Sequence, residues 1–116
     1  MNEYGKIKDD ISKILGEFEI GLKQTVMLGS RAKGEGNRYS DYDILVITYE
    51  YLTIREKMRI SKRIREEMAN AYIDVDVIIK SEDEIETLRD EVGNMVRNAL
   101  KNGILIWSKI QLRNGL

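Results

Sequence analysis

Two aspartates, Asp41 and Asp43, follow a Gly-Ser pair closely in the stretch LGSRAKGEGNRYSDYDILV, residues 28–46. Residues 41–48 are expected to form a β-strand, in which alternate side chains share one face, so both carboxylates would lie together. The chain offers no histidine or cysteine, and oxygen ligands alone suit hard cations such as Mg²⁺ or Mn²⁺. Because Mg²⁺ is normally held by one or two carboxylates plus substrate phosphates, the pair predicts metal-dependent phosphate chemistry.

A second aspartate pair, Asp74 and Asp76, lies in YIDVDVIIK, residues 72–80, where a further strand is expected. If the two strands are neighbours, one of these side chains joins Asp41 and Asp43. Two such charges about 4 Å apart repel by about 4 kcal/mol at an effective dielectric of 20, and a divalent cation reverses that cost. Spacing alone leaves both Asp74 and Asp76 as candidates.

The Gly29-Ser30 pair directly follows a short apolar strand expected over residues 25–28. A glycine there lets the backbone approach a ligand closely, and the following N–H groups with the Ser30 hydroxyl could hold phosphate oxygens. Arg31, Lys33 and Arg38 add positive charge, although loop charges are commonly only solvated. In isolation, the pair would indicate an ordinary strand-to-helix turn; with the aspartates, it favours phosphate binding.

The composition limits the chemistry further. The chain has 116 residues and a formal net charge of -1, so a single domain over residues 1–116 is expected and nucleic acid is a poor electrostatic match. Without cysteine and histidine, disulfides, thiolate nucleophiles and imidazole bases are excluded. No apolar run approaches the ~18 residues that span a membrane, and the N-terminal residues show no signal sequence, which predicts a cytoplasmic protein.

The elements that must position these residues alternate between helices and strands. Apolar residues at helical spacing predict an opening helix over about residues 7–18, and Thr53 with Glu56 forms a capping box that begins a second helix, ending near residue 69. A third helical stretch is expected after Ser81, and a last short strand over residues 104–107. The order predicts an α/β fold in which helices pack against a small sheet.

The second helix carries many charged residues on what is expected to be a solvated face. Its buried stripe is expected to comprise Ile54, Met58, Ile64 and Met68. Tyr42 alternates with the aspartates and is therefore assigned to the core, whereas Tyr39 is a candidate for stacking on a base. Trp107 is expected in the core or in a subunit contact, and the second alternative would make the protein a homo-oligomer.

These residues together resemble a known family. GSRAKGEGNRYSDYD fits the Gly-Ser, spacer, Asp-x-Asp signature of the DNA polymerase beta-like nucleotidyltransferases, and its Ala-x-Gly spacer and Ser40 are similar to those of the stand-alone minimal nucleotidyltransferases. IDVDVIIKSEDEIE and VRNALKNGILIW resemble later segments of that subgroup. The resemblance covers about residues 25–108 and implies the small mixed sheet and packed helices of the polymerase beta palm-like fold.

The resemblance also implies how a nucleotide is held. Gly29 and Ser30 match the positions that contact the β- and γ-phosphates of a nucleoside triphosphate, ATP or another, and Arg31 and Ser40 are further candidates in the same loop. Asp41, Asp43 and a third carboxylate match the ligands of two Mg²⁺ ions, with Mn²⁺ as a possible substitute. The resemblance favours Asp76 over Asp74 as this third carboxylate, which helps to deprotonate the attacking hydroxyl.

Minimal members of the family are often paired with a small helical HEPN protein as antitoxin and toxin. The resemblance therefore implies Mg²⁺-dependent transfer of a nucleotide, AMP from ATP, to a hydroxyl such as a tyrosine of a HEPN partner. An alternative is a non-catalytic module that binds nucleotide and neutralises a helical partner by complex formation. Transfer to a nucleic acid 3′ end is disfavoured by the net charge.

Overall fold

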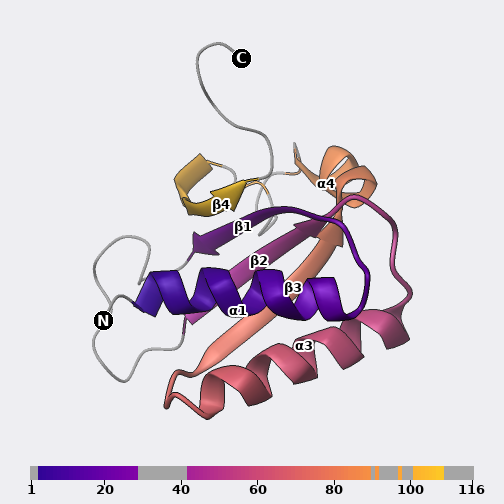
Figure 1. The fold of residues 1–116 in the computed structure, drawn as a ribbon. Helices are drawn as coiled ribbons and strands as arrows, with labels where there is room; N and C mark the ends of the chain where they lie inside the picture. Colours follow the sequence, from indigo (N-terminus) through magenta and orange to yellow (C-terminus); the bar gives the residue numbers. More distant parts are fainter. Residues whose placement is uncertain (1–2, 29–41, 90, 92–96, 98–100, 109–116) are drawn as a thin grey trace.

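The computed structural model describes residues 3–28, 42–89, 91, 97 and 101–108, which are coloured along the chain in Figure 1. Several predicted features lie outside these residues: the loop candidates Gly29, Ser30, Arg31, Lys33, Arg38, Tyr39, Ser40 and Asp41, and the helical stretch expected through Gly93. Within the described residues, no helix is long and apolar enough to cross a membrane.

A four-stranded mixed sheet forms the centre of the fold, as predicted. Its strands are β1 (Leu22–Leu28), β2 (Tyr42–Thr48), β3 (Val75–Ser81) and β4 (Ile104–Ser108), in the spatial order β3-β2-β1-β4. β2 and β3 are parallel, whereas β1 runs antiparallel to β2 and β4. The connection from β2 to β3 passes through a helix, as parallel neighbours require.

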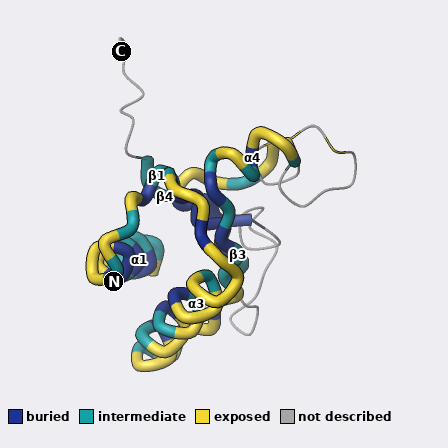
Figure 2. The backbone as a smooth tube through the Cα atoms, turned by 90° about the vertical axis from the view of Figure 1, so that its right-hand side faces the viewer, coloured by how far each residue is buried: buried dark blue, intermediate teal, exposed yellow. Residues whose placement is uncertain are grey.

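Helices cover both faces of this sheet. α1 (Glu3–Glu17) and α3 (Ile54–Ala69) share one hydrophobic core with the sheet, and α4 (Glu82–Leu88) packs on a second, smaller core. Figure 2 shows α1 and α3 on one side and α4 on the other. β2 belongs to both cores because alternate residues point to opposite faces: Ile44 and Val46 to the first, Leu45 and Ile47 to the second.

α1 is helical because its apolar residues recur at positions i, i+4, i+7 and i+8. This spacing builds one stripe, which the sheet buries completely. The buried residues are Ile7, Ile11, Ile14 and Leu15. The predicted opening helix is therefore confirmed.

α1 and α3 end in the same backbone arrangement. At the end of α1, the Ile20 N–H donates to the Leu15 carbonyl at 2.9 Å and the Glu19 N–H to the Gly16 carbonyl at 3.0 Å. These are the two hydrogen bonds of a Schellman motif, whose penultimate position is left-handed and favours glycine. Glu19 occupies that position with φ 60, and Tyr72 does so after α3 with φ 61.

α3 confirms one prediction and corrects another. The Thr53–Glu56 capping box is present at its start. Ile54 and Met58, however, are not core residues, since their side chains are 74% and 66% exposed. At 100° per residue, Met58 lies roughly 160° around the helix from the buried Ile60, so the stripe that faces the sheet is the one formed by Ile60, Ile64 and Met68.

Two strand boundaries also differ from the predictions. β3 begins at Val75 and not at Tyr72, because Tyr72 and the residue after it complete the turn that ends α3, with Ile73 donating to the Met68 carbonyl at 3.0 Å. β1 begins earlier than predicted, at Leu22, where it pairs with Thr48 at the far end of β2. β4 and the capping box at Ser81 agree with the predictions.

Candidate active site

Asp43 and Asp76 are partners in the parallel register of β2 and β3. Register partners on neighbouring strands point to the same face, and the strands lie about 4.8 Å apart. Leu28 at the end of β1 is the partner of Asp43 on its other side. We call this line of three side chains across the sheet, Leu28, Asp43 and Asp76, the carboxylate row.

The carboxylate row lies on the sheet face that α1 and α3 do not cover. Tyr42 is only 5% exposed and belongs to the core beneath α1 and α3, as predicted, so the alternating Asp43 points to the opposite face. Leu45 and Ile47 follow on that opposite face, where they pack with Ile85 of α4. The carboxylates therefore stand beside a small apolar core, at the edge of the sheet where β2 begins.

The two carboxylates of the carboxylate row differ in their surroundings. Asp43 is half-buried and Asp76 is exposed. Among the described residues, no lysine or arginine forms an ion pair with Asp76. Lys80 shares its face of β3 but lies four residues further on, roughly 13 Å away along the strand. Repulsion between neighbouring carboxylates is thus built into this edge.

Asp74 occupies a different place from Asp76. It precedes β3, and its carbonyl accepts a hydrogen bond of 2.9 Å from the Tyr42 N–H. The register extends from Tyr42–Val75 to Thr48–Ser81, so Asp76 and not Asp74 lies beside Asp43. Both aspartates remain at the same end of the sheet, and the role of Asp76 as third carboxylate stays a prediction.

The predicted phosphate loop connects to this same end of the sheet. Leu28, the last residue of β1, precedes Gly29 in the chain, and Tyr42, the first of β2, follows Asp41. Leu28 pairs with Asp43, so both ends of the 29–41 segment are attached at the carboxylate row. The sequence candidates in this segment lie outside the described residues, and their side chains are not placed.

The described part of the site fits a hard divalent cation. Asp43 and Asp76 present carboxylate oxygens from adjacent strands on one face, the donor type that Mg²⁺ and Mn²⁺ prefer. Among the described residues, no group of three or more acidic side chains is arranged to hold a metal. Two protein carboxylates with substrate phosphates are, however, a usual magnesium environment, and Asp41 is the further candidate by sequence.

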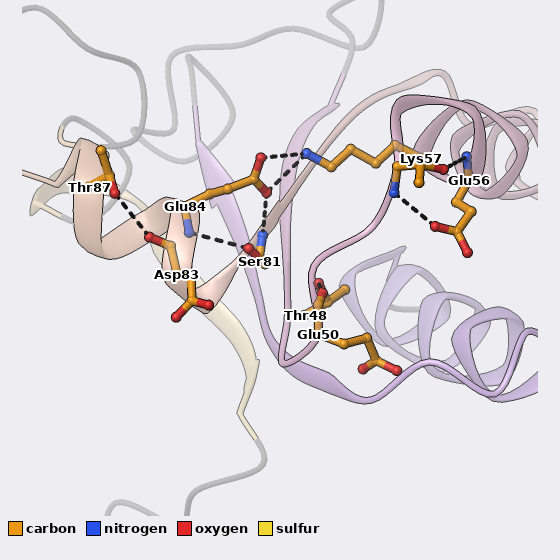
Figure 3. A network of polar contacts seen from close by, with 9 residues as sticks. Thr48, Glu50, Glu56, Lys57, Ser81, Asp83, Glu84 and Thr87 are labelled. Atoms are coloured by element: carbon orange, nitrogen blue, oxygen red, sulfur yellow. Dashed lines mark hydrogen bonds and ion pairs between the residues drawn. The ribbon is translucent and has the colours of Figure 1, made fainter.

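A polar network fixes the other end of β3. The Glu84 carboxylate accepts hydrogen bonds from the Lys57 ammonium of α3 at 2.8 and 2.9 Å and from the Ser81 N–H at 2.8 Å (Figure 3). Burial alone would raise the pKa of the Glu84 carboxyl, but the hydrogen bonds from Lys57 and Ser81 outweigh it and hold the pKa below 4.5. The network thereby ties α4 to α3 across the end of the strand that carries Asp76.

One conformational feature close to β3 was missed by the sequence reasoning. Tyr72, at the turn that leads into β3, is 97% exposed and has φ 61. A left-handed backbone is uncommon for a bulky residue, and nothing in the sequence around Tyr72 signals it. Tyr72 precedes β3 by three residues in the chain, and its side chain is open to solvent.

Comparison with known proteins identifies the family. The model of the family described as nucleotidyltransferase domain matches residues 6–106. A Methanocaldococcus jannaschii protein, named for a proposed protein adenylyltransferase activity, is 37% identical over 57 residues, which are 49% of this chain and 54% of that protein. The match thus spans about half the length of this relative.

Solved structures share the fold. A Sulfolobus solfataricus protein described as a proposed nucleotidyltransferase superposes with a TM-score of 0.61 and 23% identity, covering 90% of this chain and 79% of that one. A chain of a toxin–antitoxin complex with AMP-PNP superposes with a TM-score of 0.60 and 21% identity, covering 86% of this chain and 72% of that one. A chain of the complex of tri-AMPylated Shewanella oneidensis HEPN toxin with MNT antitoxin superposes with a TM-score of 0.58 and 18% identity. This match covers 90% of this chain and 72% of that one. At these identities, the likeness confirms the predicted fold.

Proposed function

This chain belongs to the nucleotidyltransferase domain family, and from that membership we propose that it transfers AMP from ATP to a hydroxyl group of a partner protein. The observation that carries the proposal is the register pair Asp43–Asp76 on the sheet face opposite to α1 and α3. Like charges on neighbouring strands repel each other, and this repulsion is a cost in a domain whose net stability is about 5 to 15 kcal/mol. A bound cation removes that cost, so the pair is better explained by a metal site than by folding.

Each candidate residue has a role in this proposal. Asp43 and Asp76, with Asp41, would hold Mg²⁺. When bound, the metal neutralises phosphate charge and lowers the pKa of a coordinated hydroxyl. Gly29 and Ser30 would bind the β- and γ-phosphates through backbone N–H groups and a hydroxyl.

Asp76, the more exposed carboxylate, would take the proton of the acceptor hydroxyl. The hydroxyl oxygen forms a bond to the α-phosphorus of ATP, the bond between that phosphorus and the bridging oxygen breaks, and pyrophosphate leaves with the electron pair. Such a transfer needs positioned charge and no covalent intermediate, in keeping with a chain that has no histidine or cysteine.

Two comparisons support a protein as the acceptor. The Methanocaldococcus jannaschii relative is named for adenylyl transfer to protein, and the Shewanella oneidensis complex holds an AMPylated HEPN toxin beside an MNT antitoxin. We therefore propose a small helical protein of the HEPN type as the partner and one of its tyrosines as the acceptor, which would give this chain an antitoxin role.

A labelling experiment tests the proposal. The chain is incubated with its helical partner, Mg²⁺ and ATP labelled in the α-phosphate, and incorporation into the partner is measured by gel and mass spectrometry. We expect α-label on a tyrosine, no incorporation in a parallel reaction with ATP labelled in the γ-phosphate, and loss of incorporation with Asp43→Asn or Asp76→Asn. Asp83→Asn, which removes an exposed carboxylate of α4, is the matched control and should transfer normally. Complex formation without incorporation would instead indicate a binding module.

A further inference from the structure

A groove runs between α3 and the outer edge of β3, and neither Asp43 nor Asp76 lines it. Its volume is about 950 Å³. One wall is the exposed side of α3 from Ile54 to Arg65, and the other is the middle of β3, Val77 to Ile79. We call it the α3–β3 groove. Among the strands that the structure describes, β3 is the outermost on this side and pairs with β2 alone.

The apolar part of the α3–β3 groove is exposed. Ile54 and Met58 are one helical turn apart on α3, and both are largely accessible to solvent. Val77 and Ile78 on the strand side are half-buried. Large apolar side chains gathered in a concave surface are typical of a binding site, whereas single exposed ones need no explanation.

The β3 backbone offers hydrogen bonds to this groove. Because the Tyr42 N–H donates to the Asp74 carbonyl, alternation along a parallel ladder turns the backbone groups of Asp76 and Ile78 toward β2 and those of Val77 and Ile79 outward. No strand among the described residues pairs with that outer edge. An unpaired edge of this kind is a template for one more strand.

The α3–β3 groove is positively charged. Its lining includes five basic residues and no acidic one. Lys57 is engaged by Glu84, and Arg59 lies over the Phe18 ring. The remaining three have no carboxylate partner among the described residues; they are Arg55, Lys62 and Arg65.

We propose that the α3–β3 groove binds an extended, acidic segment of a partner protein, which adds a strand to the outer edge of β3. Backbone pairing would use Val77 and Ile79, and the side chains on the α3 side would contact Ile54 and Met58 and place carboxylates near the unpaired basic residues. Charge complementarity of this kind gives specificity and speeds association. The proposal does not depend on catalysis at the carboxylate row.

A second copy of this chain is a poorer occupant of the groove. A two-fold pairing of β3 with another β3 would place both copies of α3 on the same sheet face, with their basic sides toward each other. The resulting repulsion between Arg55, Lys62, Arg65 and their counterparts opposes that dimer, whereas an acidic segment relieves the same charge.

Binding of synthetic peptides tests the proposal. The probe is a fluorescent peptide of about seven residues, the length of a typical strand, in which pairs of valines alternate with pairs of glutamates, so that each face of the strand carries both residue types. A lysine version tests the charge, and a version N-methylated at alternate residues removes backbone pairing without altering the protein. We expect saturable, salt-sensitive binding of the glutamate peptide in fluorescence anisotropy. The lysine and N-methylated peptides should bind at least about tenfold more weakly.

Protein variants locate the site. The triple variant Arg55→Glu, Lys62→Glu, Arg65→Glu should weaken binding about tenfold or more, since three charge contacts are reversed. Lys101→Glu, an exposed lysine outside the groove, is the matched control and should bind as the native chain does. If the triple variant melts lower than the native chain, Lys62→Glu alone replaces it, with a smaller loss expected.

Any of five results would overturn the proposal. The glutamate peptide could fail to bind, or bind no better than the lysine peptide. The groove variant could bind as tightly as the native chain. A gain of helical signal in circular dichroism on binding would show a helix in place of a strand. Self-association of the chain that is lost in the groove variant would assign the edge to a second copy.

Discussion

Asp43 on β2 lies directly beside Asp76 on β3, in register and on the sheet face opposite to α1 and α3. The half-buried Asp43 and the exposed Asp76 come from strands joined by a whole helix, so their juxtaposition is a property of the fold and not of a local motif. Two like charges held this close favour a state in which a cation lies between or beside them.

Neutralising Asp76 should therefore weaken the binding of Mg²⁺ and ATP without lowering the stability of the free chain. Without metal, Asp76→Asn should leave the free energy of unfolding unchanged or raise it by up to about 1 kcal/mol, because repulsion with Asp43 is relieved. Mg²⁺ and ATP at about 100 times the dissociation constant should stabilise the native chain by about 2.7 kcal/mol and the variant far less. Thermal melts of both proteins measure this, with Asp74→Asn as the control; a loss of the shift in Asp74→Asn alone would move the role to Asp74.

Glu84 should make stability depend on pH in the acid range. Its pKa is lowered in the folded chain, so its contribution is fully present above the ordinary value of 4.5 and is lost as the pH falls through the lower, folded value. Glu84→Gln should cost about 1 kcal/mol near neutral pH, where Lys57 loses its partner, and progressively less below about pH 4.5.

Urea titrations at several pH values give this difference. Glu86→Gln is the control, because Glu86 is an exposed residue of the same helix whose ion pair among the described residues is with Arg89, and its effect should stay within about 0.5 kcal/mol. An equal cost of Glu84→Gln at neutral and acid pH would show that the charge pair contributes nothing.

Glu19→Gly should stabilise the chain. Glu19 holds the left-handed position of the Schellman motif after α1, where its side chain costs roughly 1 kcal/mol that glycine avoids. Thermal or urea unfolding should show a gain of up to about 1 kcal/mol, while Lys13→Gly, at an exposed position inside α1, should lose roughly that amount. Destabilisation by both substitutions would contradict the left-handed assignment.

Met58 and Met68 should respond very differently to truncation. Met68 is fully buried in the core below α3, so Met68→Ala should cost about 2 to 5 kcal/mol in free energy of unfolding. Met58 is exposed in the α3–β3 groove, so Met58→Ala should change it by less than about 0.5 kcal/mol. Equal costs in urea unfolding would place Met58 back in the core.

The sequence was most informative where a local rule decides the structure. The capping boxes at Thr53 and Ser81 and the alternation of Tyr42 with Asp43 predicted helix starts and a strand face that the structure confirms. The apolar spacing of α3 was misleading, because Ile54 and Met58 continue an apolar pattern without facing the sheet. Which apolar stripe of a helix is buried depends on the element that packs against it, and the sequence pattern of that helix alone does not reveal this.

Relationships between distant segments could not be predicted in the same way. Lys57 and Glu84 meet only because β3 returns beside β2, and the unpaired outer edge of β3 exists only in the assembled sheet. The sequence analysis predicted that an aspartate of the second pair would lie beside Asp43 if the two strands were neighbours. The strands are neighbours, and their parallel register pairs Asp43 with Asp76. The roles of Gly29, Ser30 and Asp41 remain predictions from the sequence.

The central claim is that a divalent metal binds at the carboxylate row, and paramagnetic broadening by Mn²⁺ tests it most directly. In amide spectra of the native chain with ATP, substoichiometric Mn²⁺ should first broaden Leu28, Asp43 and Asp76, while Ser12 of α1, on the other side of the sheet, stays sharp. The double variant Asp43→Asn, Asp76→Asn should lose this selective broadening. Broadening centred on the acidic first turn of α4, Glu82–Glu84, and unchanged in the double variant would contradict the claim.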